Sequence, residues 1–141
     1  MLLRYGTFSY ATMEQERDMN FTNNEMRPLV QLHNQSSYVG EWLVGTEIRE
    51  GKGVQVWSDG SLYEGYWKNN KANYFGRLLH KDGDIYQGEW KDDQAHGFGY
   101  YFHQDGSLYR GFWKNDTQDG RGVERWPDGS KFEGNYEAGV K

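Results

Sequence analysis

The chain has 141 residues and contains no cysteine. A disulfide framework, a thiolate metal site and a cysteine nucleophile are therefore excluded. Apolar runs are short, and none approaches the roughly 20 residues that a membrane-spanning helix needs. Residues 1–5 carry one positive charge without an apolar stretch behind it, so we expect no secretory signal. We expect a cytoplasmic protein, while an organelle transit peptide stays open as an alternative.

Aliphatic side chains are also scarce. Hydrophobic residues make up 35% of the chain, aromatic residues alone make up 17%, and 19 residues are glycine. This balance favours a single-layer repeat sheet, in which neighbouring units cover one another's rings, over a two-layer core. The 16 basic and 21 acidic residues are mixed along the chain, with a net charge of −5 and no basic block. We therefore expect no nucleic-acid partner, and membrane binding that is weak or indirect.

A pattern with a period of 23 residues organises the chain. Its clearest copy begins with Tyr-x-Gly-x-Trp at residues 86–90 and continues with Gly-x-Gly at 97–99 and Asp-Gly at 105–106. Further copies start at Tyr63 and Tyr109, an earlier one at Tyr38 is two residues longer inside its turn, and a partial one starts at Phe132. Self-similarity at such a period indicates an array of supersecondary units.

Each unit is predicted to form two short antiparallel strands. Residues at alternate positions of a strand share a face, so the Tyr, Gly and Trp of one copy lie together. Asp-Gly supplies the positive φ that a tight turn requires. We therefore expect consecutive hairpins over residues 38–136, with almost no helix and with turns at four Asp-Gly pairs. These pairs are Asp59-Gly60, Asp82-Gly83, Asp105-Gly106 and Asp128-Gly129.

The glycines inside the strands need a reason, because glycine weakens a strand unless something approaches closely. We infer that each leaves a gap over which a Tyr or Trp ring of the neighbouring strand lies. Two units depart from the pattern. Tyr74 stands where the first glycine of a pair is expected, which predicts a narrower or filled groove there, and the longer turn at residues 46–50 is expected to protrude.

Tyr-x-Gly-x-Trp followed by Gly-x-Gly and Asp-Gly at this period resembles the MORN repeat, the membrane occupation and recognition nexus motif. The resemblance covers residues 38–136. It implies an all-β fold: a rod-like, single-layer twisted antiparallel sheet of consecutive β-hairpins with an aromatic groove along one face. Similar repeats occur in radial-spoke head proteins of cilia, in membrane tethers, in some lipid kinases and ahead of some methyltransferase domains, mostly as binding scaffolds.

Two regions are expected. Residues 38–141 form the repeat array, with four full units and one partial unit. Residues 1–37 form a degenerate N-terminal capping segment that is partly irregular. Its capping strands are expected at residues 6–10 and 29–33, and a turn is expected at 34–37. Between the two strands we expect either a short helix near residues 13–19 or a mobile polar segment.

We predict that the chain is not an enzyme and has no catalytic residue, metal site or cofactor. His80 and His103 occupy the slot that holds Trp57 and Trp126 in other units, so they are interpreted as ring-shaped filling. Equivalent positions lie about 10 Å apart, a poor geometry for one zinc ion. Asp92, Asp93, Asp116 and Asp119 are interpreted as turn residues.

The predicted function is that of a non-catalytic scaffold, which binds an elongated segment of a partner protein along the aromatic row. The partner would belong to a larger assembly, by resemblance a ciliary, axonemal or other cytoskeletal one, and self-association is possible. The alternatives are a phospholipid-membrane tether, a targeting module of a larger enzyme such as a lipid kinase, and a row whose rings are all consumed by internal packing. The predicted partner-binding residues are Tyr38, Trp42, Tyr63, Trp67, Tyr86, Trp90, Tyr109 and Trp113.

Overall fold

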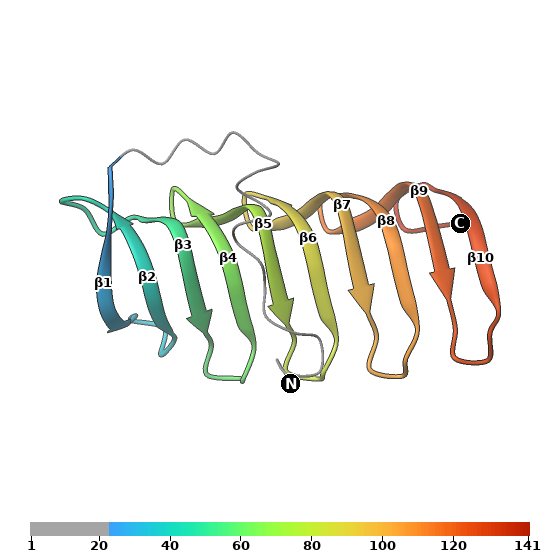
Figure 1. The fold of residues 1–141 in the computed structure, drawn as a ribbon, viewed down its shortest axis with the longest axis horizontal. Coiled ribbons are helices and arrows are strands. Elements are labelled where there is room, and N and C mark those ends of the chain that lie inside the picture. The colour runs from blue at the N-terminus through green and yellow to red at the C-terminus, as the bar shows by residue number, and fades with distance from the viewer. Residues whose placement is uncertain (1–22) are drawn as a thin grey trace.

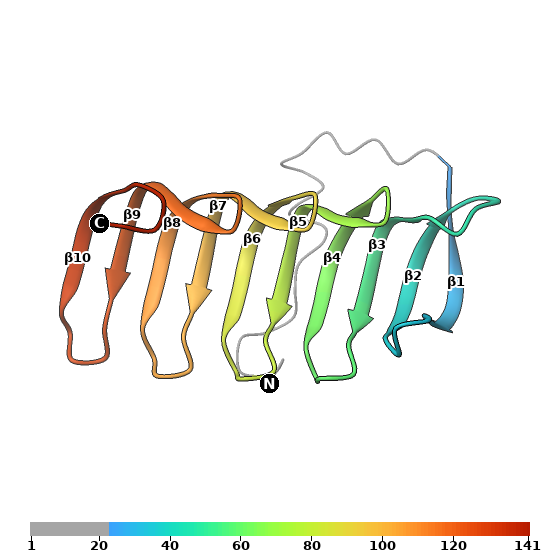
Figure 2. The same ribbon diagram turned by 180° about the vertical axis from the view of Figure 1, so that it is seen from behind.

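The computed structural model describes residues 23–141, which form one open sheet of ten antiparallel strands. The strands follow one another in sequence order, so every strand pairs with its neighbours in the chain (Figures 1 and 2). No helix occurs in this part of the chain, and the predicted all-β array of hairpins is confirmed. The strands are β1 (Asn24–Gln31), β2 (Ser37–Leu43), β3 (Arg49–Val56), β4 (Leu62–Lys68), β5 (Lys71–Leu79), β6 (Ile85–Lys91), β7 (Gln94–Phe102), β8 (Leu108–Lys114), β9 (Thr117–Arg125) and β10 (Lys131–Tyr136).

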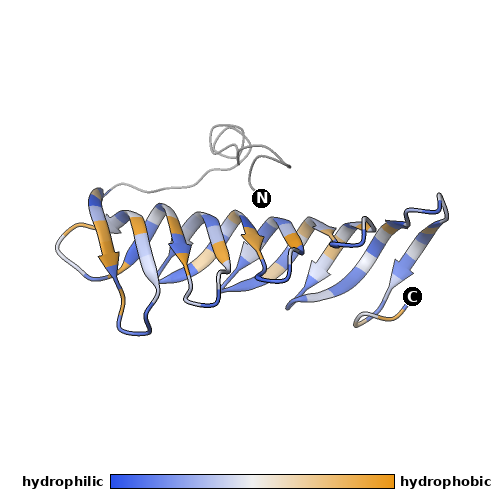
Figure 3. Ribbon diagram, turned by 90° about the horizontal axis from the view of Figure 1, so that it is seen from below, coloured by the Kyte–Doolittle hydropathy of each residue, from blue (hydrophilic) through white to orange (hydrophobic). Residues whose placement is uncertain are grey.

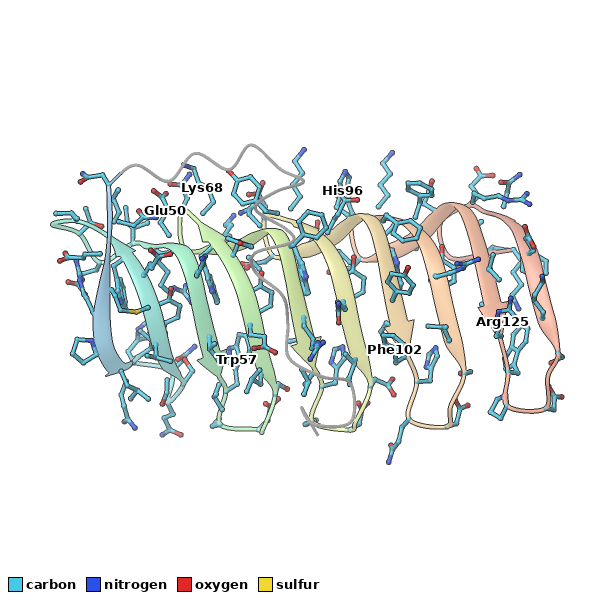
Figure 4. All side chains as sticks on the ribbon, viewed as in Figure 1. Glu50, Trp57, Lys68, His96, Phe102 and Arg125 are labelled. Carbon is cyan, nitrogen blue, oxygen red and sulfur yellow. The ribbon has the colours of Figure 1, made fainter. Side chains whose placement is uncertain are left out.

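One edge of the sheet carries the Asp-Gly turns, as predicted. In the first of them the Gly60 N–H donates to the Trp57 carbonyl at 3.0 Å, and the Ser61 N–H donates to Asp59 Oδ1 at 2.8 Å. Gly60 has a φ of 96°, a left-handed conformation that side-chain-bearing residues rarely adopt. Figure 4 shows Trp57, Phe102 and Arg125 toward this edge.

The other edge carries two-residue turns in which both residues have positive φ, the geometry that suits the twist of a hairpin. Asp92 and Asp93 have φ values of 49° and 70°, and Asn69-Asn70 and Asn115-Asp116 repeat them. Glu50, Lys68 and His96 lie at this edge (Figure 4), with Lys68 Nζ 3.5 Å from Glu50 Oε1. Asp119, interpreted as a turn residue, lies instead within β9, because two residues suffice to connect β8 to β9.

The first unit has the predicted longer turn. Residues 44–48 connect β2 to β3, where the other units use two residues. This loop extends beyond the edge of the sheet (Figure 2), and the Glu47 side chain is 90% exposed. The expected protrusion is confirmed.

The N-terminal cap is partly described. The strand predicted at residues 29–33 exists as β1, which starts earlier, ends at Gln31 and pairs antiparallel with β2. The predicted turn follows it, with Gln35 at a φ of 66°. The strand expected at residues 6–10 and the helix or mobile segment near 13–19 lie outside the described residues.

The core is a row of rings on one face of the sheet, which we call the ring face. Tyr and Trp alternate along it in edge-to-face contact, with Tyr63 centred 5.1 Å from Trp67 and 5.3 Å from Trp90. Figure 3 shows hydrophobic and hydrophilic stretches interspersed along the array, so the row does not stand out there as a continuous hydrophobic band. This is expected because hydropathy scales rank Tyr and Trp near the middle, although their rings bury large areas.

Paired glycines make room for these rings, as the sequence indicated. A Cβ placed on Gly111 would lie 2.6 Å from the Gly122 Cα and 2.7 Å from the Tyr109 hydroxyl oxygen. Backbone carbonyls accept hydrogen bonds from the polar edges of rings within the row. The Tyr109 hydroxyl donates to the Phe112 carbonyl at 2.9 Å, and the Trp113 indole N–H donates to the Gly99 carbonyl of the preceding unit at 3.3 Å.

A second set of hydrogen bonds ties each two-residue turn to the hairpin before it. Asp93 Oδ1 accepts a hydrogen bond from the Ala72 N–H at 2.7 Å, and the Asp93 N–H donates to the Ala72 carbonyl at 2.9 Å. Asp116 makes the same two hydrogen bonds with the backbone of Ala95, and Asn70 makes them with the backbone of Arg49. An amide oxygen and a carboxylate oxygen therefore serve equally as the acceptor.

The glycine gaps predict a contrast between neighbouring positions. Gly111→Val should lower the melting temperature because its side chain would collide with Gly122 and Tyr109, an overpacking cost of about 1 to 3 kcal/mol or more. Arg110→Val, at the adjacent exposed position on the opposite face, should change it little. Thermal unfolding followed by circular dichroism compares the two variants, and equal melting temperatures would contradict this account of the core.

The turn hydrogen bonds predict a second contrast. Asp93→Ala should destabilise the chain by about 1 to 2 kcal/mol, since it removes the acceptor for the Ala72 N–H and places alanine at positive φ. Asp93→Asn should leave stability nearly unchanged, as Asn70 already fills the equivalent position. Urea denaturation of both variants measures the difference, and a loss as large in the Asn variant as in the Ala variant would show that charge stabilises the turn.

Candidate functional site

The eight predicted partner-binding residues lie together on the ring face, from β2 to β8. Seven of them are at most 9% exposed, and only Trp113 is half-buried. Their rings contact one another edge to face, as in the pair Tyr86–Trp113 with centroids 5.3 Å apart. A partner would therefore meet the outer edges of these rings, and their role in binding remains a prediction. Five of the eight form the floor of a groove, namely Tyr63, Trp67, Tyr86, Trp90 and Trp113, whereas Tyr38, Trp42 and Tyr109 line neither of its hollows.

The groove consists of two adjoining hollows on the ring face. The first, of about 490 Å³, lies over Tyr63, Trp67 and Trp90. The second, of about 300 Å³, lies over Tyr86, Trp90 and Trp113. Trp90, Leu78, His80 and Asp93 line both, so the two hollows lie side by side across neighbouring units. Tyr74, the departure from which a narrower or filled groove was predicted, lines neither of these two hollows and so does not fill them.

Small side chains stand beside the indoles in the middle units. Ala72 lines the first hollow and Ala95 the second. The equivalent residue 23 positions before Ala72 is Arg49, whose guanidinium carbon lies 4.4 Å from the Trp67 ring centroid. Sequence reasoning missed this residue, although aligning the units would have revealed an arginine in an alanine slot.

Arg49 is held firmly in place. Its guanidinium donates to the Asn70 carbonyl at 2.8 Å and to the side-chain oxygen of Gln55. Burial lowers the pKa of Arg49 from its usual range, and nearby Tyr38 and Asp93 oppose that shift. Arg49 thus covers the ring of Trp67 at the β3 end of the groove.

The rim near the two-residue turns is acidic. Asp93 and Asp116 line the groove there, each anchored through Oδ1 to a backbone N–H of the preceding hairpin. Both are exposed residues, so their carboxylates are in contact with solvent. The sequence identified them as turn residues but gave no sign that they border a groove, because that depends on how consecutive units stack.

The rim near the Asp-Gly turns carries half-buried rings. His80 is centred 6.2 Å from the Tyr101 ring and His103 4.6 Å from it, consistent with ring-shaped filling. The Tyr101 hydroxyl donates to Asp84 Oδ2 at 2.8 Å. Within residues 23–141 no group of three or more His, Cys, Asp or Glu side chains is placed to hold a metal ion.

The buried tyrosines are not acid–base groups near neutral pH. Burial, followed by the carboxylates of Glu124 and Asp119, raises the pKa of Tyr109 to about 12. Burial raises the pKa of Tyr86 and Tyr101 as well, with Asp116 and Asp84 respectively adding to it. These phenols therefore remain protonated, and they act as hydrogen-bond donors to backbone and carboxylate oxygens.

The opposite face of the sheet carries a smaller aromatic cluster that sequence reasoning missed. Phe98 on β7 and Phe112 on β8 are paired across the strands, with centroids 5.5 Å apart and exposed fractions of 36% and 47%. Tyr100, also 36% exposed, packs against Phe98 at 5.4 Å. Their alternation with the paired glycines was the available signal, since alternate residues of a strand face opposite sides.

Comparison with known families agrees with this geometry. The MORN repeat model matches residues 48–62, 63–85, 86–108 and 109–131, more than half of the chain, and three of the four matches begin at the tyrosine that opens a unit. A search of curated proteins found no match. In the described part of the chain no helix is suited to crossing a membrane. On the strength of these four matches and of the hairpin array, the chain belongs to the MORN-repeat family.

Proposed function

We propose that this chain is a non-catalytic protein-interaction scaffold that holds an elongated segment of a partner protein in the groove on its ring face. MORN repeats are modules for protein and membrane interaction, which supports the general class. The observation that carries the specific proposal is that two hollows adjoin along the array and share four lining residues, among them Trp90. An open groove that runs along the array suits an extended chain.

The repeat geometry supports a chain, and not a small molecule, as the ligand. Successive units are two strand spacings apart, about 10 Å, so equivalent contacts recur along the array. A small molecule is usually held in a concave site that encloses most of its surface. Contacts that recur at a fixed interval instead favour a ligand that is itself regular and extended.

The binding energy would be concentrated on a few side chains. Trp113 is the most accessible ring of the row, and Leu78 presents a half-buried aliphatic surface to both hollows. Tryptophan is enriched at positions that dominate interface energetics. The buried rings of Tyr63 and Trp67 would support the floor without contributing much contact area of their own.

The setting of this interaction is proposed from the family resemblance. We place the chain in the cytoplasm, in a ciliary, axonemal or other cytoskeletal assembly, with its partner as another component of that assembly. Self-association is compatible with the proposal, because a second copy could present a segment to the same groove.

The proposal predicts that substitutions on the ring face weaken partner binding, whereas substitutions on the opposite face of the sheet do not. Trp113→Ala and Leu78→Ala should weaken capture of the partner about tenfold or more, as each removes contact area from the groove. Phe112→Ala, adjacent in sequence to Trp113 but on the opposite face, should retain it. The measurement is a pull-down from cells that express the chain, with bound proteins quantified by mass spectrometry.

Circular dichroism should first establish that all three variants are folded. If the groove variants kept every partner while Phe112→Ala lost one, the working surface would be the aromatic cluster of the opposite face. The rings of the row would then be core alone.

The membrane-tether alternative predicts a different outcome. Residues 38–141 contain 13 basic and 17 acidic residues without a basic cluster, whereas each basic residue near an acidic membrane contributes about 1 kcal/mol. We expect weak binding to acidic liposomes in a sedimentation assay, lost by about 150 mM salt. Salt-resistant, sub-micromolar binding would favour the tether over the scaffold.

A further inference from the structure

The charges around the groove are unbalanced. Among the described residues that line it, Asp59, Asp93 and Asp116 stand against the single guanidinium of Arg49. That guanidinium is already engaged, because it lies on the Trp67 ring and donates to Asn70. The groove thus offers a ligand an aromatic floor and a negatively charged rim.

We propose that the segment received by the groove is basic, with lysine or arginine side chains that reach Asp93 and Asp116; this rests on the proposed function above. The aliphatic stem of such a side chain packs on the indole edge of Trp90 or Trp113, while its charged end meets the carboxylate on the rim. The ligand class follows from the complementarity of both parts, floor and rim, with one kind of side chain.

The repeat sets the spacing of the basic residues. Asp93 and Asp116 are equivalent positions of consecutive units, about 10 Å apart along the array. A polyproline II segment has three residues per turn and advances about 9 Å per turn. Every third side chain therefore returns to the same side of the segment. A segment with a basic residue at every third position therefore matches the rim.

The chain supplies its own structural controls. Asn70 occupies the position equivalent to Asp93 and Asp116 and makes the same backbone hydrogen bond, so aspartate can be replaced by asparagine there without loss of the turn. Asn69 and Asn115 occupy the position equivalent to Asp92, which is exposed and does not line the groove. Asp92→Asn therefore removes a charge from the same turn without altering the rim.

The test uses three labelled peptides of four repeats each, Leu-Pro-Lys, Leu-Pro-Gln and Leu-Pro-Glu, whose prolines favour the polyproline II conformation. Fluorescence anisotropy measures their dissociation constants with the full chain and with its variants, at low and at high salt. We expect the lysine peptide to bind most tightly and the glutamate peptide most weakly. The Asp93→Asn/Asp116→Asn variant should bind the lysine peptide roughly 5- to 30-fold more weakly at low salt, while Asp92→Asn should change binding less than about twofold.

Each other outcome overturns the inference. The rim charge would not select the ligand if the lysine and glutamine peptides bound equally well. The same would follow if Asp92→Asn and Asp93→Asn/Asp116→Asn weakened binding of the lysine peptide equally. If all three peptides bound alike and Trp113→Ala weakened all of them, the groove would be a binding site without charge preference, so the proposed function would stand while this inference failed. Binding of none of them would overturn the basic ligand, and the pull-down above would then decide the proposed function separately.

Discussion

The fold depends on the contact between a tyrosine ring and the paired glycines beneath it. Tyr109 crosses the space where side chains would stand on Gly111 and Gly122, so its ring lies against the backbone of two strands. Its hydroxyl then reaches a carbonyl of its own strand. A single sheet can bury aromatic rings in this manner without a second layer, because the flat ring covers backbone while its polar group still finds a partner.

This contact also makes the units interdependent. The indole of Trp90 packs edge-to-face on Tyr63 of the preceding unit and donates to the Gly76 carbonyl at 3.0 Å. Trp42, the first indole of the row, has no such acceptor among the described residues, and its N–H is buried without a partner. Each interior unit is therefore completed by its neighbour, as expected of arrays stabilised by nearest-neighbour interfaces.

Most of the fold could be predicted from the sequence because its signals are local and repeated. The period located the strands, and the Asp-Gly pairs located one set of turns. The two-residue turns were harder to predict, because Asn69-Asn70 and Asp92-Asp93 have different residue types although they share the same backbone geometry. The extent to which Trp90 is buried could not be predicted, because it depends on the ring that the preceding unit supplies. For the same reason, the sequence indicated the aromatic row but not the rim around it.

The division between repeated and unit-specific residues explains how such an array could become selective. The residues that fill the core are nearly identical in every unit, and they pack against one another. The residue beside each indole, by contrast, differs between units. In the first unit it is Arg49, which covers the Trp67 ring, whereas in the next two it is Ala72 and Ala95, which leave the groove open. Substitution at that position changes the depth and charge of the groove without disturbing the tyrosine and glycine contacts. On the proposed function, this position would therefore set which ligand the groove accepts while the frame of tyrosines and glycines stays constant.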